Sequence, residues 1–204
     1  MFAGPVLADG EDIGDQAVPA TATDKSGVFE LKALGAVLAD ANTGSILYEK
    51  ESHEKRPIAS ITKIMSMLLV MEALDSGKVK YDDMVQVSEH SFSMGGSQVY
   101  LEPGEEFTVT EMMKAVAIHS ANDATVALAE KVAGSEEAFV NMMNEKAEQL
   151  GMKNTHFLDV TGLTDEGHYS TAHDISIMAR ELIDKHPKVL EFTSIWHDTF
   201  RGGE

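Results

Sequence analysis

The fold of this chain is built around a stretch that begins Ala59-Ser60-Ile61-Thr62-Lys63-Ile64-Met65. The longest apolar run of the sequence starts within it and continues to Leu74, and Gly77 follows as a typical helix stop. Apolar residues lie nearly all round the predicted helix, as in helices that are buried on most faces. The run covers only about half of the roughly 20 residues that a membrane span needs. We therefore predict a central core helix over residues 60–76.

The composition limits the size and the partners of the protein. The chain has 204 residues, of which 34 are acidic and 16 basic, so its formal net charge is −18 at pH 7. Such a length holds one substantial core, with or without a smaller appended lobe. The acidity disfavours nucleic-acid and anionic-membrane partners, because phosphate-rich partners need clustered Lys and Arg. The absence of cysteine excludes disulfides, thiolate zinc sites and a cysteine nucleophile.

Residues 1–28 are expected to form a flexible lead. The first 24 residues hold five acidic side chains and no basic one, together with several Gly, Pro and Ala residues. Such a composition does not repay the entropy of ordering. Val6-Leu7-Ala8 has the small-residue spacing of a signal-peptidase site. Two interpretations stay open here: an ordinary flexible terminus, or the remnant of an export signal.

From residue 29 onward the pattern predicts an ordered α/β domain that is rich in helix. Two short apolar runs, 34–40 and 45–49, flank Asn42-Thr43-Gly44, which favours a β-hairpin. Region 81–165 is expected to be a mostly helical insertion in a domain that covers 29–204. The other elements expected are strands at 85–87, 98–101 and 107–109, and helices at 110–118, 123–132, 136–150 and 171–184.

Ser60 and Lys63 form an S-x-x-K motif at the start of the core helix. A spacing of i, i+3 places both side chains on one face of a helix. Such a pair works as nucleophile and base when burial lowers the pKa of the lysine enough to leave a neutral amine. The helix N-terminus adds backbone N–H groups that can face an oxyanion.

The S-x-x-K motif is weak when it is taken alone, because a chain of this length contains about one copy by chance. A second copy, Ser52 with Lys55, lies in a polar stretch and is interpreted as a solvated loop. The alternative for the first copy is a purely structural role, with Ser60 as a helix N-cap and Lys63 as a surface lysine in the first turn.

A second motif, Ser120-Ala121-Asn122, is the only S-x-N of the chain. A structural alternative exists here too, since Ser120 and Asp123 have capping-box spacing ahead of an Ala-rich helix. A functional role needs a hydroxyl that relays a proton and an amide that holds both Lys63 and the substrate backbone. The two motifs come in this order, both at predicted helix starts, which favours the functional interpretation.

Five segments together resemble the low-molecular-weight penicillin-binding proteins of peptidase family S11. They are Ala59-Ser60-Ile61-Thr62-Lys63-Ile64-Met65, Gly96-Ser97-Gln98-Val99-Tyr100-Leu101, His119-Ser120-Ala121-Asn122-Asp123-Ala124, Gly151-Met152-Lys153-Asn154-Thr155-His156-Phe157 and His168-Tyr169-Ser170-Thr171-Ala172-His173-Asp174. The resemblance extends from about residue 30 to about residue 200. Within the family it is nearest to the D-alanyl-D-alanine carboxypeptidases of vegetative wall trimming and spore cortex formation. It implies a β-lactamase/DD-peptidase-like transpeptidase fold, with an antiparallel sheet and a helical region.

The resemblance also implies an activity and the residues that perform it. Enzymes of this family remove the terminal D-alanine from peptidoglycan stem peptides through an acyl-serine intermediate, and β-lactams inhibit them covalently. By this resemblance Ser60 is the nucleophile and Lys63 the base that activates it. Ser120 is the proton relay toward the leaving D-alanine, and Asn122 is the amide that orients Lys63 and the acyl chain. The resemblance implies no metal or organic cofactor, and a location outside the cytoplasm, secreted or at the outer face of the cytoplasmic membrane.

One part of the family pattern is missing. A Lys-Thr-Gly or Lys-Ser-Gly triplet should follow on a later strand, but none occurs after Asn122. Lys25-Ser26-Gly27 precedes the nucleophile and is assigned to chance. We expect a chain cut before this motif, without the last sheet strands and without the C-terminal segment through which the family contacts the membrane. Acylation of this chain by β-lactams is accordingly expected to be weak or absent.

Two other function classes stay open. A class A β-lactamase shares the first two motifs, but its E-x-x-L-N loop does not occur in residues 154–170. A non-catalytic peptidoglycan-binding fragment gains support from the missing third motif. A zinc peptidase is disfavoured, because H-E-x-x-H does not occur and the eight histidines are scattered.

Overall fold

The computed structural model describes residues 31–164 and 166–203, so the lead expected at 1–28, with its Lys-Ser-Gly triplet, lies outside the described residues. The strands are β1 (Ala36–Ala39), β2 (Ile46–Lys50), β3 (Met84–Gln86) and β4 (Glu106–Thr108). The α-helices are α1 (Lys63–Asp75), α2 (Glu89–Phe92), α3 (Val109–His119), α4 (Asn122–Ala133), α5 (Glu136–Gln149), α6 (Ala172–Lys185) and α7 (Leu190–Thr193). The 3-10 turns are η1 (Ala59–Thr62), η2 (Pro187–Val189) and η3 (Arg201–Gly203). The division into a domain 29–204 with an insertion at 81–165 stays a prediction.

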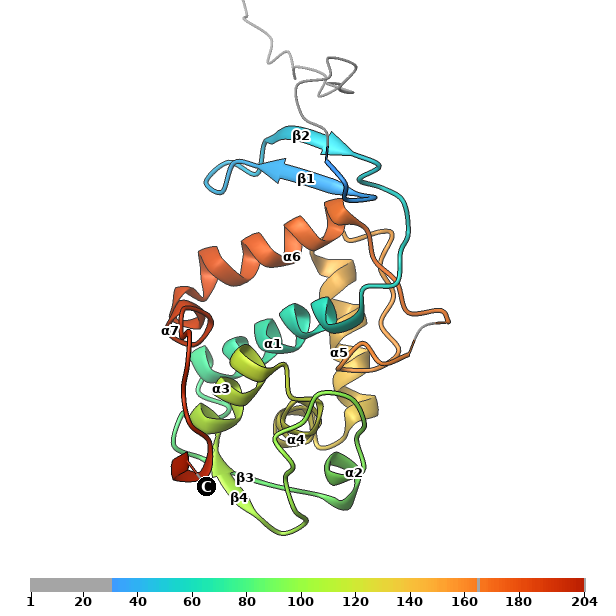
Figure 1. The fold of residues 1–204 in the computed structure, drawn as a ribbon. Coiled ribbons are helices and arrows are strands. Elements are labelled where there is room, and N and C mark those ends of the chain that lie inside the picture. The colour runs from blue at the N-terminus through green and yellow to red at the C-terminus, as the bar shows by residue number, and fades with distance from the viewer. Residues whose placement is uncertain (1–30, 165, 204) are drawn as a thin grey trace, which may run out of the picture.

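Helix α1 lies at the centre of the molecule, between α6 and α4, and α5 runs alongside it (Figure 1). Ten of its 13 residues are buried, which confirms the predicted core helix. The α-helix begins at Lys63 rather than at Ser60, because residues 59–62 form the tighter turn η1. It ends where Gly77 takes a φ of +73°. Among the described helices, none is long and apolar enough to span a membrane.

The predicted N-terminal hairpin is confirmed by the antiparallel pair β1 and β2. Asp40 closes the turn, because its Oδ1 accepts hydrogen bonds from the backbone N and the Oγ1 of Thr43 at 2.7 and 2.8 Å. Arg180 of α6 donates hydrogen bonds to the carbonyl oxygens of Ala41 and Asn42, each at 2.8 Å. The hairpin is therefore fixed on α6, at the opposite end of the molecule from β3 and β4 (Figure 1).

Strands β3 and β4 form a second antiparallel pair, which confirms two of the three strands predicted in this region to within one residue. The third, at 98–101, is wrong. The backbone N–H groups of Val99 and Leu101 donate to the carboxylate of Asp123, each at 3.1 Å, instead of to a neighbouring strand. Tyr100 between them has a φ of +55°, outside the extended region that strands require.

The chain passes from α3 to α4 through Ser120, which takes a left-handed conformation with φ 56° and ψ 36°. The capping box predicted for Ser120 and Asp123 is wrong. Ala121 is the N-cap of α4, without a side-chain hydrogen bond, because the Asp123 carboxylate serves the loop at 99–101. The helices predicted at 136–150 and 171–184 are confirmed, with Ser135 and Thr171 as their N-caps.

Candidate active site

Ser60 lies in the turn η1, directly ahead of α1, and its side chain is exposed. Lys63 is the first residue of α1 and is only 3% exposed. The Lys63 Nζ donates a hydrogen bond to the Ser60 Oγ at 3.1 Å. The alternative of an N-cap serine and a surface lysine is therefore wrong, since Thr62 is the N-cap of α1 and Lys63 is buried. The pair combines an accessible hydroxyl with a desolvated amine.

The surroundings of Lys63 favour a neutral amine. Its Nζ donates a second hydrogen bond, to the carbonyl oxygen of Thr161, at 3.0 Å. Burial lowers the pKa of Lys63 from 10.5 to about 8, although the nearby carboxylate of Asp159 acts in the opposite direction. A large fraction of this side chain is thus neutral close to pH 8, which is what a general base requires.

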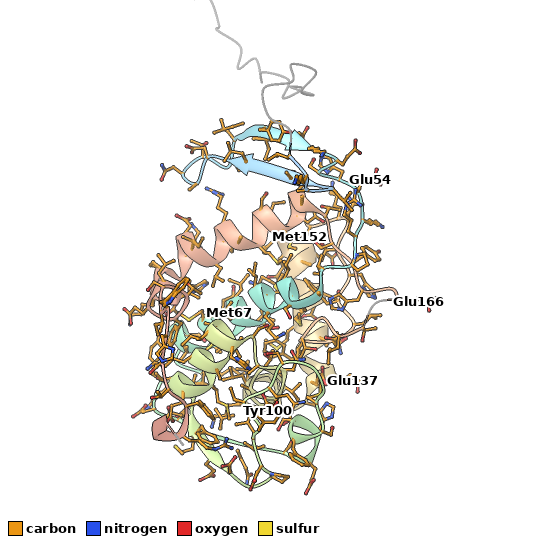
Figure 2. All side chains as sticks on the ribbon, viewed as in Figure 1. Glu54, Met67, Tyr100, Glu137, Met152 and Glu166 are labelled. Atoms are coloured by element: carbon orange, nitrogen blue, oxygen red, sulfur yellow. The ribbon has the colours of Figure 1, made fainter. Side chains whose placement is uncertain are left out.

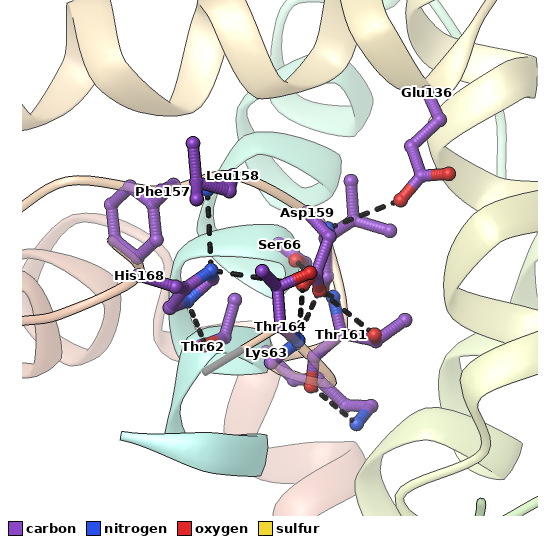
Figure 3. A network of polar contacts seen from close by, with 12 residues as sticks. Thr62, Lys63, Ser66, Glu136, Phe157, Leu158, Asp159, Thr161, Thr164 and His168 are labelled. Atoms are coloured by element: carbon purple, nitrogen blue, oxygen red, sulfur yellow. Dashed lines mark hydrogen bonds and ion pairs between the residues drawn. The ribbon is translucent and has the colours of Figure 1, made fainter. Parts of the chain in front are cut away.

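The segment 159–164 supplies the acceptor for Lys63, and Asp159 holds this segment together (Figure 3). The Asp159 Oδ1 accepts from the backbone N and Oγ1 of Thr161, at 2.7 and 2.9 Å, and from the backbone N of Gly162 at 2.5 Å. Its Oδ2 accepts from the backbone N of Thr164 at 2.8 Å. Burial raises the pKa of Asp159, but hydrogen bonds from Thr164, Thr161 and Gly162 outweigh burial and hold the pKa well below its usual range. The carboxylate is therefore ionised near neutral pH.

Gly162 brings this segment into direct contact with the turn that carries Ser60. Its φ is +85°, and a Cβ at this position would lie 1.9 Å from the carbonyl oxygen of Ala59 and 2.8 Å from the Oγ1 of Thr62. Only glycine fits such a close approach of two backbones. Ala59 itself has a φ of +43°, a strained conformation immediately before Ser60. The position of Ser60 therefore depends on the fit between these two segments.

His168 braces the same turn from the interior of the protein. Its ring is buried, with Nε2 2.8 Å from the Oγ1 of Thr62, and its Nδ1 accepts from the backbone N of Leu158 at 3.2 Å. Because that backbone N–H can only donate, we assign the ring proton to Nε2. Burial lowers the pKa of His168, although Asp159 opposes this effect, so the ring is neutral at pH 7.

The second motif and the segment 159–164 both approach Gly96. Asn122 is buried, and its Nδ2 donates to the carbonyl oxygen of Gly95 at 2.7 Å. That bond fixes the amide and leaves Oδ1 without a hydrogen-bond partner among the described residues. A Cβ at Gly96 would lie 2.7 Å from the Asn122 Nδ2 and 3.3 Å from the Cδ2 of Leu163. Asn122 and Leu163, which follows directly on Gly162, therefore both lie against Gly96.

The structure brings Ser60 and Lys63 into contact but does not join either of them to the second motif by a hydrogen bond. In residues 31–164 and 166–203, neither Ser120 nor Asn122 bonds to the Lys63 Nζ, which is held by Ser60 and Thr161. Ser120 nevertheless has the left-handed backbone of a strained residue, and such strain is concentrated at functional sites. The relay role of Ser120 and the orienting role of Asn122 stay predictions.

Comparison with known proteins identifies the family to which these motifs belong. A family model described as D-alanyl-D-alanine carboxypeptidase, of the peptidase S11 group, matches residues 19–204. The chain belongs to this family. The resemblance inferred from the five sequence segments is thereby confirmed.

Two curated members of the family illustrate the extent of the match. The D-alanyl-D-alanine carboxypeptidase DacF of Bacillus subtilis is 57% identical over 170 residues, which are 83% of this chain and 43% of the relative. The D-alanyl-D-alanine carboxypeptidase DacA of Escherichia coli is 35% identical over 182 residues, which are 86% of this chain and 45% of the relative. The chain thus spans less than half the length of these two relatives.

Solved structures of similar proteins share the fold. The D-alanyl-D-alanine carboxypeptidase DacD from Francisella tularensis has a TM-score of 0.79 and 38% identity, covering 81% of this chain and 40% of that one. Penicillin-binding protein D2 from Listeria monocytogenes, in an ampicillin-bound form, has a TM-score of 0.75 and 30% identity, covering 86% of this chain and 71% of that one. The predicted α-rich α/β fold of DD-peptidases is confirmed.

Sequence reasoning missed the third contributor to the site of this family member, the segment 159–164. The signal was present, because Asp159 lies three positions before Gly162, a spacing typical of a turn closed by an aspartate side chain. The sequence pattern predicts neither a helix nor a strand for this segment. Nothing in the local pattern indicates that Thr161 meets Lys63, which lies 98 positions earlier in the chain.

Proposed function

We propose that this protein is a serine-type D-alanyl-D-alanine carboxypeptidase that removes the terminal D-alanine from peptidoglycan stem peptides. One observation carries the proposal: the exposed Ser60 hydroxyl lies 3.1 Å from the buried amine of Lys63, whose pKa is lowered to about 8. In this reaction Ser60 is the nucleophile and Lys63 the general base. Ser120 relays a proton to the leaving group, and Asn122 binds the acyl chain of the substrate.

The acylation step follows from the geometry of the Ser60 and Lys63 pair. The neutral Lys63 amine accepts the hydroxyl proton while the Ser60 Oγ attacks the carbonyl carbon between the two D-alanines. The carbonyl carbon becomes tetrahedral, and its oxygen becomes an oxyanion that needs hydrogen-bond donors. Collapse of this intermediate breaks the C–N bond. The departing D-alanine nitrogen takes the proton from Lys63 through the hydroxyl of Ser120.

The second half of the reaction regenerates the enzyme. A water molecule attacks the acyl-Ser60 carbonyl, and Lys63, neutral again, accepts the water proton. The ester C–O bond then breaks, the Ser60 oxygen recovers a proton from Lys63, and the shortened stem peptide leaves. Every proton in this scheme is taken up or returned by the chain itself. The buried Oδ1 of Asn122, which has no hydrogen-bond partner in the described part of the chain, supports a role as acceptor for a backbone N–H of the substrate.

The proposal extends to inhibitors and location. A β-lactam presents an amide carbonyl to Ser60 and forms the same kind of acyl-serine, with the lactam nitrogen as the leaving group. The ampicillin-bound form of the Listeria protein supports this expectation. Because stem peptides lie outside the cytoplasmic membrane, we expect the protein there too, secreted or at the outer face of the cytoplasmic membrane. Its process would be wall trimming or spore cortex formation.

Release of D-alanine tests the proposal. The protein is incubated with a synthetic peptide that ends in D-alanyl-D-alanine, and free D-alanine is measured with time. We expect release that Ser60→Ala abolishes, and no release from the same peptide ending in D-alanyl-L-alanine. Serine-independent release would contradict the proposal.

The same protein sample distinguishes two alternative functions from a carboxypeptidase. A β-lactamase would turn over a β-lactam many times per molecule, whereas a carboxypeptidase holds it as a lasting acyl-enzyme. If the protein is a non-catalytic peptidoglycan-binding protein, the wild type and Ser60→Ala would bind stem peptides equally well. Neither of the two would release D-alanine.

A further inference from the structure

The Asp159 carboxylate is the centre of a network that no catalytic step above uses directly. It accepts four hydrogen bonds from its own segment, which fix the peptide planes between residues 161 and 164. The carbonyl of Thr161 belongs to one of these planes, and its oxygen accepts from the Lys63 Nζ at 3.0 Å. Figure 3 shows Asp159 between His168 and Lys63, with the dashed contacts running through the segment.

We propose that Asp159 is the positioning residue for Lys63, because its carboxylate holds the segment 159–164 in the conformation that presents the Thr161 carbonyl to the Lys63 amine. The inference rests on the proposed function, in which Lys63 is the base. Three peptide N–H groups and one hydroxyl converge on the Asp159 carboxylate, so an uncharged side chain cannot satisfy all of them equally well.

The charge of Asp159 has a second effect on the same nitrogen. Burial makes the Lys63 amine easier to deprotonate, and the Asp159 carboxylate opposes burial, so the pKa of about 8 is the balance of the two. Asp159 remains ionised throughout the range in which Lys63 titrates, since its own pKa is held well below the usual range. A stronger base accepts the Ser60 proton more readily, but it is neutral in a smaller fraction of molecules. A pKa of about 8 keeps Lys63 largely neutral near pH 8 while it remains a strong enough base to accept this proton.

Other charged groups around the network do not take over this role. The His168 Nδ1 lies 3.7 Å from the Asp159 Oδ2, but burial lowers the pKa of this ring and leaves it neutral at pH 7. Glu136 of α5 accepts from the backbone N of Val160 at 3.3 Å and pairs with the ring of His90 at 2.6 Å. It ties the segment to α5 from outside, and Asp159 is the charge that acts on Lys63 among the described residues.

The test measures the pKa of Lys63 directly, without any need for turnover. The protein is labelled with ¹³C-lysine, the Lys63 ¹³Cε resonance is assigned by its loss in Lys63→Arg, and its chemical shift is followed from pH 6 to pH 11. In Asp159→Asn we expect the Lys63 pKa to fall by about half a unit or more, because a nearby negative charge is lost. The matched control is Glu136→Gln, which removes a carboxylate bonded to the same segment and should leave the Lys63 pKa unchanged.

A second measurement separates positioning from a general loss of structure. The rate of covalent labelling of Ser60 by a fluorescent penicillin is recorded against pH. In Asp159→Asn the rise of the rate should move to lower pH and its plateau should fall at least tenfold. A merely structural role would lower the plateau without moving the pH at which the rate rises.

The outcomes decide between the proposals. A Lys63 pKa that is unchanged in a folded Asp159→Asn, or that falls equally in Glu136→Gln, overturns the role of Asp159. If Asp159→Asn does not fold, Asp159→Ser, which has a shorter, uncharged acceptor, replaces it in the titration. Wild-type protein that titrates as expected but is labelled equally well after Ser60→Ala refutes the proposed function and not the effect of Asp159 on Lys63.

Discussion

The Nζ of Lys63 donates a hydrogen bond to the Oγ of Ser60 across 3.1 Å, although the two residues belong to different elements, the turn η1 and the helix α1. Ser60 is exposed, while the whole side chain of Lys63 is buried. Figure 2 shows the side chains that surround α1. This contrast gives the pair its chemistry. A nucleophile must meet substrate, and its base must be kept from water.

The lowered pKa of Lys63 predicts how acylation of Ser60 depends on pH. The reactive form has a neutral amine, and its population grows as pH rises through a pKa of about 8. The rate of labelling by a fluorescent penicillin should therefore rise about tenfold between pH 7 and pH 9, in proportion to the neutral fraction. Lys63→Arg, which stays charged, should label at least about 100-fold more slowly. A flat pH profile would show that another group is the base.

The close approach of Gly162 to Ala59 predicts a stability difference between two glycines. Gly162→Ala would place a Cβ 1.9 Å from the Ala59 carbonyl oxygen, whereas Gly134 has a similar φ of +87° and open space around it. Gly134→Ala should cost about 1–2 kcal/mol of unfolding free energy, from left-handed strain alone. Gly162→Ala adds overpacking and should cost about 3–5 kcal/mol. Urea denaturation of both variants measures the difference, and equal costs would mean that the two segments do not meet as described.

Burial of the neutral His168 ring predicts a loss of stability in mild acid. The unfolded histidine takes up a proton near its ordinary pKa of about 6.5, while the folded ring has a lowered pKa and resists protonation. The unfolded state therefore binds more protons as pH falls below 6.5, and the free energy of unfolding decreases there. Asp159 has the lowered pKa of a paired carboxyl, so its contribution is lost only further into acid, below its ordinary value of 3.8.

The variant His168→Gln isolates this effect, because glutamine keeps a donor toward Thr62 but does not titrate. We expect the wild-type protein to lose more unfolding free energy than this variant between pH 7 and pH 5, measured by urea denaturation at each pH. Parallel losses in the two proteins would place the acid sensitivity elsewhere.

The predictable parts of the fold were those that local chemistry specifies. The apolar run after Lys63 identified the central helix, and the turn residues Asn42-Thr43-Gly44 identified the hairpin, because burial and turn geometry leave their mark in neighbouring positions. The strand expected at 98–101 failed for the opposite reason. Asp123, more than 20 positions away, takes the backbone N–H groups that a strand would use.

The residues of the candidate site also differ in whether a local sequence pattern predicts them. Ser60, Lys63, Ser120 and Asn122 were predicted because their residue types and order carry the family pattern. Asp159 was not predicted, since the role proposed for it depends on a contact between segments about 100 positions apart that no local pattern encodes. The same applies to Gly162. Only the structure shows that the backbone of Ala59 leaves no room for a side chain at this position.

The most direct test of the account is to locate a covalent penicillin adduct by mass spectrometry. The protein is incubated with an excess of a fluorescent penicillin for a long period, digested, and mapped, with Ser60→Ala and Lys63→Arg in parallel. The account predicts a single adduct on Ser60, however slowly it forms, that is lost in Ser60→Ala and strongly reduced in Lys63→Arg. An adduct that survives Ser60→Ala, or an adduct on another residue of the wild-type protein, would contradict it.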